Sequence, residues 1–140
     1  MDLVALLAIG AQAQVTFTDV TASSGIDFTH APFDVPGEHA LMIGGAAALD
    51  VDGDGRLDLV LLAGGGRPDA LYRNQGDGTF LDEAALWGLD TPHRGAGVCA
   101  GDVDRDGDLD LYMTSYGPVP GARGPGRHRL LLNTGHDFID

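Results

Sequence analysis

Four aspartates in the stretch LDVDGDGRLDLVLL (residues 49–62) have the spacing of a metal-binding loop. They stand at the first, third, fifth and ninth positions of the loop, with glycine at the sixth: Asp50, Asp52, Asp54, Asp58 and Gly55. Alternate residues of a tight loop can direct their oxygens toward one centre, and the glycine permits a turn that a Cβ would hinder. Several hard oxygen ligands favour Ca²⁺ over Zn²⁺, which prefers His and Cys, and over Mg²⁺, which demands stricter octahedral geometry.

The same pattern returns in AGDVDRDGDLDLYMTS (residues 100–115), although Asp and Gly also serve simple turns. A recurrent pattern favours metal binding over turn formation alone. At the seventh position the residue type varies, so a backbone carbonyl is the expected ligand there. The sequence therefore predicts two Ca²⁺ sites. The first is formed by Asp50, Asp52, Asp54, Arg56 and Asp58, and the second by Asp102, Asp104, Asp106, Asp108 and Asp110.

The residues around both loops indicate strands, not the helices of an EF-hand. An EF-hand loop ends in a glutamate at position 12, where these loops have Leu61 and Met113. The stretches after the loops, LDLVLL and LDLYMTS, have a strand-like period of two. This period predicts that one face of each following strand is buried, namely Leu57, Leu59, Leu61, Leu109, Leu111 and Met113.

Larger segments of the chain repeat as well. FTDVTASSGID (17–27) matches FLDEAALWGLD (80–90), and ALYRNQGDGTF (70–80) matches RLLLNTGHDF (129–138). We expect a repeat region over 14–140, with repeat 1 at about 17–79 and repeat 2 at about 80–137. Each repeat contains four short strand-like runs, such as GGAAAL, LDLVLL, ALYRN and TFLDEA, which is the content of one propeller blade. The predicted fold is all-β, with antiparallel four-stranded blades, no helix longer than two turns after the N-terminal segment, and Trp87 and Leu89 packed between blades.

These motifs resemble FG-GAP/VCBS repeats, which build the β-propellers of integrin α-subunits. Three sequence segments are also similar to those of ASPIC/UnbV and cartilage-acidic-protein-like secreted proteins, namely FTDVTASSGIDFTH, GGAAALDVDGDGRLDL and LYRNQGDGTF. The resemblance covers about residues 15–140 and implies calcium ligands at the aspartates in positions one, three, five and nine of both loops. It also implies a seven-bladed propeller, whereas only two repeats and a stub, FID (138–140), are present. A propeller needs about 4–8 blades, so we expect either a fragment of a longer protein or pairing with another copy.

The N-terminal segment and the net charge limit the cellular setting. MDLVALLAIGAQA (1–13) has an apolar run and an A-x-A site, as in a signal peptide, although Asp2 replaces the usual basic start. The apolar run is too short to span a bilayer, so no transmembrane segment is expected. We therefore expect a secreted protein, extracellular or periplasmic. The formal net charge of −13 argues against nucleic-acid partners, which require clustered Lys and Arg.

Two classes of function remain open from the sequence. The first is a calcium-binding module for adhesion or for binding an extracellular protein or glycan, with structural calcium and no catalysis. The alternative is a catalytic or non-catalytic part of an extracellular hydrolase or lyase built on a propeller. His30 and His93 occupy matching places in the repeats and follow Asp27 and Asp90, but scaffold features recur with a repeat whereas a catalytic pair is normally single. Cys99 is expected to be a small buried strand residue.

Overall fold

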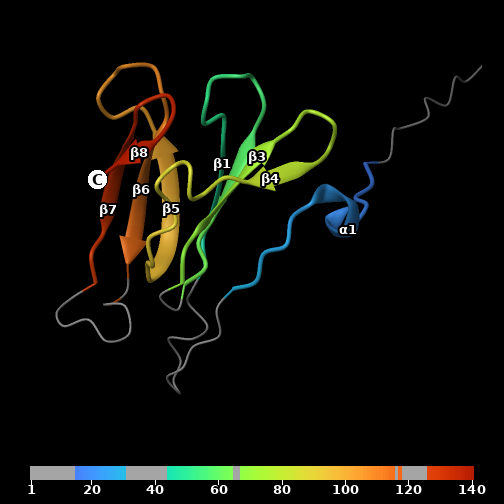
Figure 1. The fold of residues 1–140 in the computed structure, drawn as a ribbon, viewed down its shortest axis with the longest axis horizontal. Coiled ribbons are helices and arrows are strands. Elements are labelled where there is room, and N and C mark those ends of the chain that lie inside the picture. Colours follow the sequence, from blue (N-terminus) through green and yellow to red (C-terminus); the bar gives the residue numbers. More distant parts are fainter. Residues whose placement is uncertain (1–14, 31–43, 65–66, 116, 118–125) are drawn as a thin grey trace, which may run out of the picture.

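The computed structural model describes residues 15–30, 44–64, 67–115, 117 and 126–140 (Figure 1). Within these residues it contains a single one-turn helix and eight short strands, so the all-β prediction is confirmed. The proposed signal segment, 1–13, lies outside the described residues. In chain order the elements are α1 (Thr21–Ser24), β1 (Ala46–Leu49), β2 (Asp58–Leu61), β3 (Ala70–Asn74), β4 (Phe80–Asp82), β5 (Gly95–Gly101), β6 (Asp110–Ser115), β7 (Arg129–Asn133) and β8 (Phe138–Ile139).

The strands form two four-stranded antiparallel sheets, each made of strands in sequential order. The first sheet has the order β1-β2-β3-β4 and the second β5-β6-β7-β8. In the first sheet Leu49 pairs with Asp58, and in the second Gly101 pairs with Asp110, so each Asp-rich loop closes the first hairpin of its sheet. Figure 1 shows both loops at the same end of the pair of sheets. This topology places the two candidate sites in equivalent positions.

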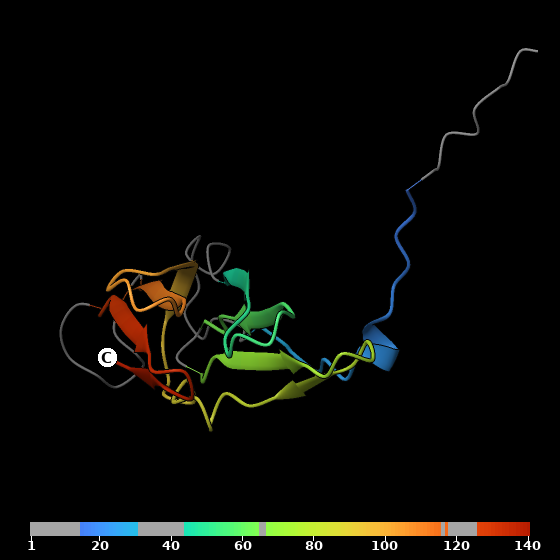
Figure 2. The same ribbon diagram turned by 90° about the horizontal axis from the view of Figure 1, so that it is seen from above.

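The hydrophobic core lies between the two sheets, which Figure 2 shows side by side. The loop between β4 and β5 closes one side of this core, and its Trp87 and Leu89 are buried there, as predicted. The first strands of the sheets also approach closely, because a Cβ on Gly45 would lie 3.0 Å from the Cα of Gly97. The buried apolar side chains are Leu49, Val51, Val60, Leu62, Leu71, Ala84, Trp87, Leu89, Leu111, Met113, Leu131 and Phe138.

The segments that precede the two sheets pack in the same manner. Gly25 follows α1 with a left-handed backbone (φ 76°), and Gly88 has φ 72° at the matching place of the second repeat. A Cβ on Gly25 would meet the carbonyl oxygen of Phe80 at 2.7 Å, and one on Gly88 would meet that of Phe138 at 3.2 Å. Each segment therefore lies against the fourth strand of the sheet that follows it in the chain.

The predicted buried face is wrong for the first sheet and right in part for the second. Leu57 is exposed and Leu59 and Leu61 are half-buried, whereas the alternate residues Val60 and Leu62 are fully buried. In the second sheet Leu111 and Met113 are fully buried as predicted, and Leu109 is half-buried. The two sheets turn opposite faces of their second strands toward the shared core. Alternation along one strand shows that two faces exist, but it does not show which of them meets the neighbouring sheet.

The outer face of the second sheet exposes apolar side chains, and here the expectation that Cys99 is buried is wrong. Cys99 lies in β5 as predicted but is exposed, beside Tyr112 in the register of the sheet. Tyr112, Leu130 and Ile139 have 43%, 44% and 52% of their surface exposed. Cys99 is exposed because it points away from the core, as Tyr112 does. We refer to these four residues as the outer face.

Candidate metal-binding loops

Backbone conformation in the loops follows the glycine pattern of the sequence. In the first loop Gly53 and Gly55 have φ values of 73° and 85°, in the left-handed region where a Cβ is unfavourable. In the second loop Gly107 has φ 101°, and Arg105 takes the same conformation (φ 68°) at the place that matches Gly53. The glycine at position six thus has the turning role that the sequence predicts, in both loops.

The carboxylate at the first position of each loop accepts hydrogen bonds from backbone N–H groups of the same loop. In the first loop Asp50 accepts hydrogen bonds from the N–H groups of Asp54 (3.0 Å) and Gly55 (2.8 Å). In the second, Asp102 accepts hydrogen bonds from the N–H groups of Arg105 (2.6 Å) and Gly107 (3.3 Å). These contacts curl each loop around its first aspartate.

The ninth-position aspartates are buried at the start of β2 and β6. Asp58 has no exposed surface and accepts hydrogen bonds from the N–H groups of Val51 (3.0 Å) and Asn74 (2.8 Å). Asp110 is 1% exposed and accepts the equivalent bonds from Val103 (2.8 Å) and Asn133 (2.9 Å). Both carboxylates therefore join the loop to the third strand of the sheet.

Three carboxylates converge in each loop closely enough to hold a metal ion. Oxygens of Asp50, Asp52 and Asp58 lie within 4.8 Å of one another, and so do oxygens of Asp102, Asp104 and Asp106. The structure thus brings together six of the ten residues predicted for the two sites. Carboxylate oxygen is the ligand type that Ca²⁺ prefers, so the residues present fit that ion.

The other four predicted residues take different places. Asp54 forms an ion pair with Arg56, whose Nε also donates to the carbonyl oxygen of Asn74 (3.0 Å). In the second loop Asp108 donates its N–H to Asp106 (3.0 Å), and Asp110 is held by the backbone contacts given above. None of these contacts involves the carbonyl oxygen of the seventh-position residue, the atom expected to be a ligand there.

Crowding of negative charge is visible in the second loop. Loss of hydration in the folded loop raises the pKa of Asp104. A hydrogen bond from the N–H of Asp106 (3.2 Å) opposes this, but the nearby charges of Asp106 and Asp110 also raise the pKa, and the net shift is upward. A cation among these carboxylates would relieve this repulsion.

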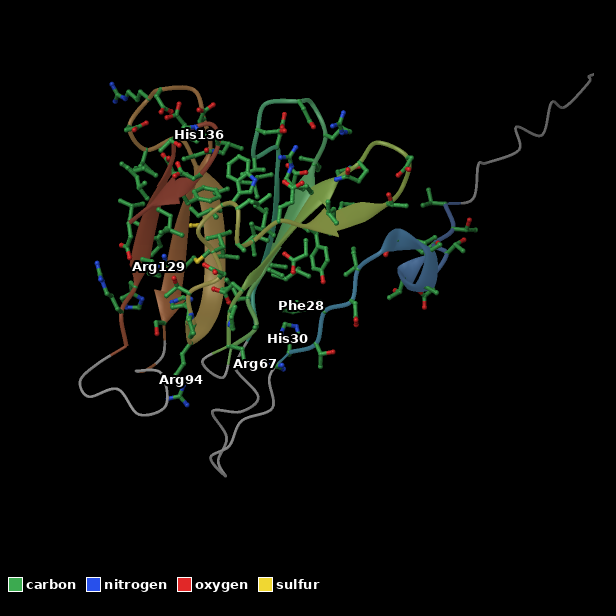
Figure 3. The ribbon with its side chains drawn as sticks, in the orientation of Figure 1. Phe28, His30, Arg67, Arg94, Arg129 and His136 are labelled. Atoms are coloured by element: carbon green, nitrogen blue, oxygen red, sulfur yellow. The ribbon has the colours of Figure 1, made fainter. Side chains whose placement is uncertain are left out.

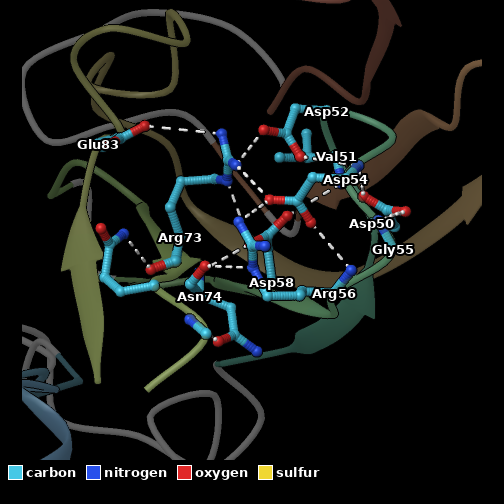
Figure 4. Close-up of polar contacts among 12 residues, drawn as sticks. Asp50, Val51, Asp52, Asp54, Gly55, Arg56, Asp58, Arg73, Asn74 and Glu83 are labelled. Atoms are coloured by element: carbon cyan, nitrogen blue, oxygen red, sulfur yellow. Dashed lines mark hydrogen bonds and ion pairs between the residues drawn. The ribbon is translucent and has the colours of Figure 1, made fainter. Parts of the chain in front are cut away.

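Sequence reasoning missed two residues that organise the loops, Arg73 and Asn133. Arg73 directly precedes Asn74 in β3. Its guanidinium forms ion pairs with Asp52, Asp54 and Asp58 of the first loop (Figure 4). The matching runs ALYRN and RLLLN contain a signal for Asn133, because both end in an asparagine, whereas Arg73 has leucine at its matching place and is not indicated by the repeat.

Asn133 connects the two loops across the core. Its side chain is 2% exposed and donates to the carbonyl oxygens of Val51 (2.8 Å), in the first loop, and Leu109 (3.3 Å), in the second. Asn74, its counterpart in the first sheet, donates only to the carbonyl oxygen of Leu57 (3.1 Å) among the described residues. Both asparagines also accept the N–H two residues further on.

Asn133→Ala is therefore expected to destabilise the chain more than Asn74→Ala. Removing Asn133 leaves two carbonyl oxygens without their donor, at an expected cost of about 1–3 kcal/mol. Asn74→Ala, which removes one hydrogen bond to a carbonyl and the same local turn contact, should cost roughly 0.5–1.5 kcal/mol. Urea denaturation of both variants measures this difference. Equal losses would show that the bond to Val51 adds nothing to stability.

The repeated histidines have structural contacts that differ from the suggested His–Asp pairing. His93 is buried, and its Nδ1 lies 3.3 Å from the carboxylate of Asp69, not from that of Asp90. Figure 3 draws the side chains and labels His30. His30 instead has its Nδ1 3.1 Å from the carbonyl oxygen of Leu62. Each histidine thus ties the segment before a sheet to the connection that follows β2.

A pair of successive four-stranded antiparallel sheets, each with an Asp-rich loop in its first hairpin, defines a β-repeat protein. Residues 50–113 match the family model described as FG-GAP-like repeat. This stretch runs from the first aspartate of the first loop into β6 and includes both loops. It is therefore an FG-GAP-like repeat region, as the resemblance predicted.

The chain is also similar to curated proteins over a stretch of comparable length. Over 66 residues, 46% of this chain, it is 42% identical to cartilage acidic protein 1 from Homo sapiens and from Mus musculus. Over 68 residues, 48% of this chain, it is 38% identical to cartilage acidic protein 1 from Xenopus tropicalis. The aligned part spans 9–10% of the length of these curated relatives. No helix in the described part of the chain has the length and hydropathy required to cross a bilayer.

Proposed function

We propose that this chain is a secreted calcium-binding module of β-propeller type that binds a protein or glycan partner without catalysis. The observation that carries the proposal is the recurrence of one loop at the same end of two successive sheets, with three converging aspartates in each copy. The two loops have different residues at other positions but share the same aspartates. Cation binding therefore explains the pattern better than turn formation does.

Calcium would have a structural role in this proposal. Each loop joins the first two strands of its sheet, and its first- and ninth-position aspartates stand at the two ends of the loop. In the first loop an ion held by Asp50 and Asp58 would join both ends and close the hairpin, and in both loops an ion would offset the repulsion among the converging carboxylates. Extracellular modules bind Ca²⁺ with Kd values of about 10⁻⁴–10⁻³ M, which agrees with a secreted protein. Relatives whose name refers to cartilage support the same localisation.

The outer face supports the proposal that the sheets are consecutive blades. Tyr112 and Leu130 match Val60 and Leu71, which are fully buried in the first sheet against the second. A further four-stranded sheet of the same repeat, supplied by more blades or by another copy, would bury the outer face in the same way. The partner for adhesion would then bind to the completed propeller.

Calorimetric titration of the chain with Ca²⁺ tests this function. We expect two sites in the wild type, and loss or at least roughly tenfold weakening of the second-loop site in Asp104→Ala, because affinity follows the number of charged ligands. Asp77→Ala is the matched control, since Asp77 is an exposed turn aspartate that binds Thr79 and belongs to neither loop. No saturable heat in the wild type, or equal weakening in the control, would contradict the proposal.

A further inference from the structure

Arg73 supplies the first loop with a positive charge from the protein itself. Its Nε lies 3.1 Å from Asp58 and its Nη2 lies 3.3 Å from Asp54, and Nη2 also forms an ion pair with Asp52 (Figure 4). The side chain is only 11% exposed, and its guanidinium carbon lies 5.7 Å from the centre of the Trp87 ring. Arg73 is therefore held between the core and two of the three aspartates that converge in the first loop.

At the matching place of the sequence, the second sheet has leucine instead of this arginine. Arg73 precedes Asn74, whose N–H binds the ninth-position Asp58, and Leu132 precedes Asn133, whose N–H binds Asp110. Leu132 thus occupies the place of Arg73 and offers no charge. The arginine within the second loop, Arg105, contributes its backbone N–H to Asp102.

The charge balance of the two loops differs accordingly. Two arginines, Arg56 and Arg73, form ion pairs with three of the four aspartates of the first loop, namely Asp52, Asp54 and Asp58. The second loop has five aspartates, because Asp108 stands where the first has Arg56. A bound guanidinium lowers the repulsion that opens a loop without metal, and it repels an arriving divalent cation.

From this difference we propose that Arg73 makes the two calcium loops unequal. The first loop is held closed by Arg73 without metal and binds Ca²⁺ weakly, whereas the second loop depends on Ca²⁺ for its order and binds it first. The inference rests on the proposed calcium function and adds an order of filling to it. As the Ca²⁺ concentration rises, the second loop would become ordered before the first loop binds an ion.

Hydrogen exchange of the wild-type chain tests the order of filling without any substitution. In chelator we expect slower exchange at the amides of Asp54 and Gly55 than at those of Arg105 and Gly107. Each of these N–H groups donates to the first-position aspartate of its own loop. As Ca²⁺ is added, protection should rise in the second loop at a concentration at least about tenfold below that for the first. Equal exchange in chelator with a common midpoint, or earlier filling of the first loop, would overturn the inference.

Reciprocal substitutions test whether Arg73 is the cause. Arg73→Leu gives the first loop the residue of the second and should strengthen its Ca²⁺ affinity by about tenfold or more, while raising its exchange in chelator. Leu132→Arg should weaken the second loop by a similar factor and slow its exchange in chelator. Leu132 is only half-buried, so an arginine at this position can reach solvent and the fold should tolerate it. Leu132→Arg therefore still tests the inference if Arg73→Leu fails to fold.

Arg67→Leu is the control for a change in net charge alone. Arg67 is exposed and lies at the end of the sheets opposite the loops (Figure 3), so its removal should leave both affinities within about twofold of wild type. Unchanged affinities in both reciprocal variants would overturn the role of Arg73 while leaving calcium binding intact. Absence of Ca²⁺ binding at both loops in every variant would instead contradict the proposed function, and the inference with it.

Discussion

Asp58→Ala is expected to lower the free energy of unfolding by about 3–5 kcal/mol, the usual loss when one partner of a buried ion pair is removed. Asp58 is fully buried, and its two oxygens accept hydrogen bonds from Val51 N–H, Asn74 N–H and the Nε of Arg73. The alanine variant would leave these three donors without their acceptor. The loss is a large part of the roughly 5–15 kcal/mol that stabilises a typical domain.

Chemical denaturation in chelator measures this effect without a contribution from metal. Asp77→Ala provides the matched control, because Asp77 is an exposed aspartate that accepts bonds within its own turn. We expect the control to change stability far less than Asp58→Ala. A similar small change for both variants would show that the buried carboxylate is not required to hold the loop to β3.

Trp87→Ala is expected to cost about 3–5 kcal/mol as well, for a different reason. Trp87 is 5% exposed and packs in the core between the sheets, with its ring centre 5.7 Å from that of Phe138. The substitution would create a large cavity between the sheets and remove the surface on which the Arg73 guanidinium lies. We therefore expect loss of stability together with weaker docking of the second sheet on the first.

The adjacent Leu86 is a control for this substitution. It has 73% of its surface exposed, so Leu86→Ala should change the free energy of unfolding by no more than about 0.5 kcal/mol. Urea denaturation compares the free energies of unfolding of the two variants. Far-ultraviolet circular dichroism should be the signal, because it reports on the backbone and does not require Trp87. If Trp87→Ala were as stable as Leu86→Ala, the core between the sheets would not be the main source of their association.

The sequence predicts the local structure of this chain well, because the relevant signals lie close together. The Asp and Gly spacing located both loops, and the period of two located the strands that follow them. Matching of the two repeats placed Trp87 and Leu89 between the sheets. In each case the residues that determine the structure lie within a few positions of one another or recur with the repeat.

The contacts that the sequence did not predict depend on how distant segments meet. Which face of β2 is buried depends on the position of the second sheet, so Val60 and not Leu59 reaches the core. The exposure of Cys99 depends on what covers the outer face. The hydrogen bond from Asn133 to Val51 joins residues 82 positions apart, and the ion pairs of Arg73 reach back 15–21 positions. Local spacing contains no information about such contacts.

Thermal unfolding of the wild-type chain in excess Ca²⁺ and in chelator tests the central claim most directly. An ion that binds only the folded form adds RT ln(1 + [Ca²⁺]/Kd), which is about 2.7 kcal/mol at one hundred times Kd. We therefore predict a clearly higher Tm in Ca²⁺ than in chelator, and a smaller increase in Mg²⁺, because Mg²⁺ requires stricter octahedral geometry. Identical transitions in excess Ca²⁺ and in chelator would contradict the account and leave both loops as turns without a bound ion.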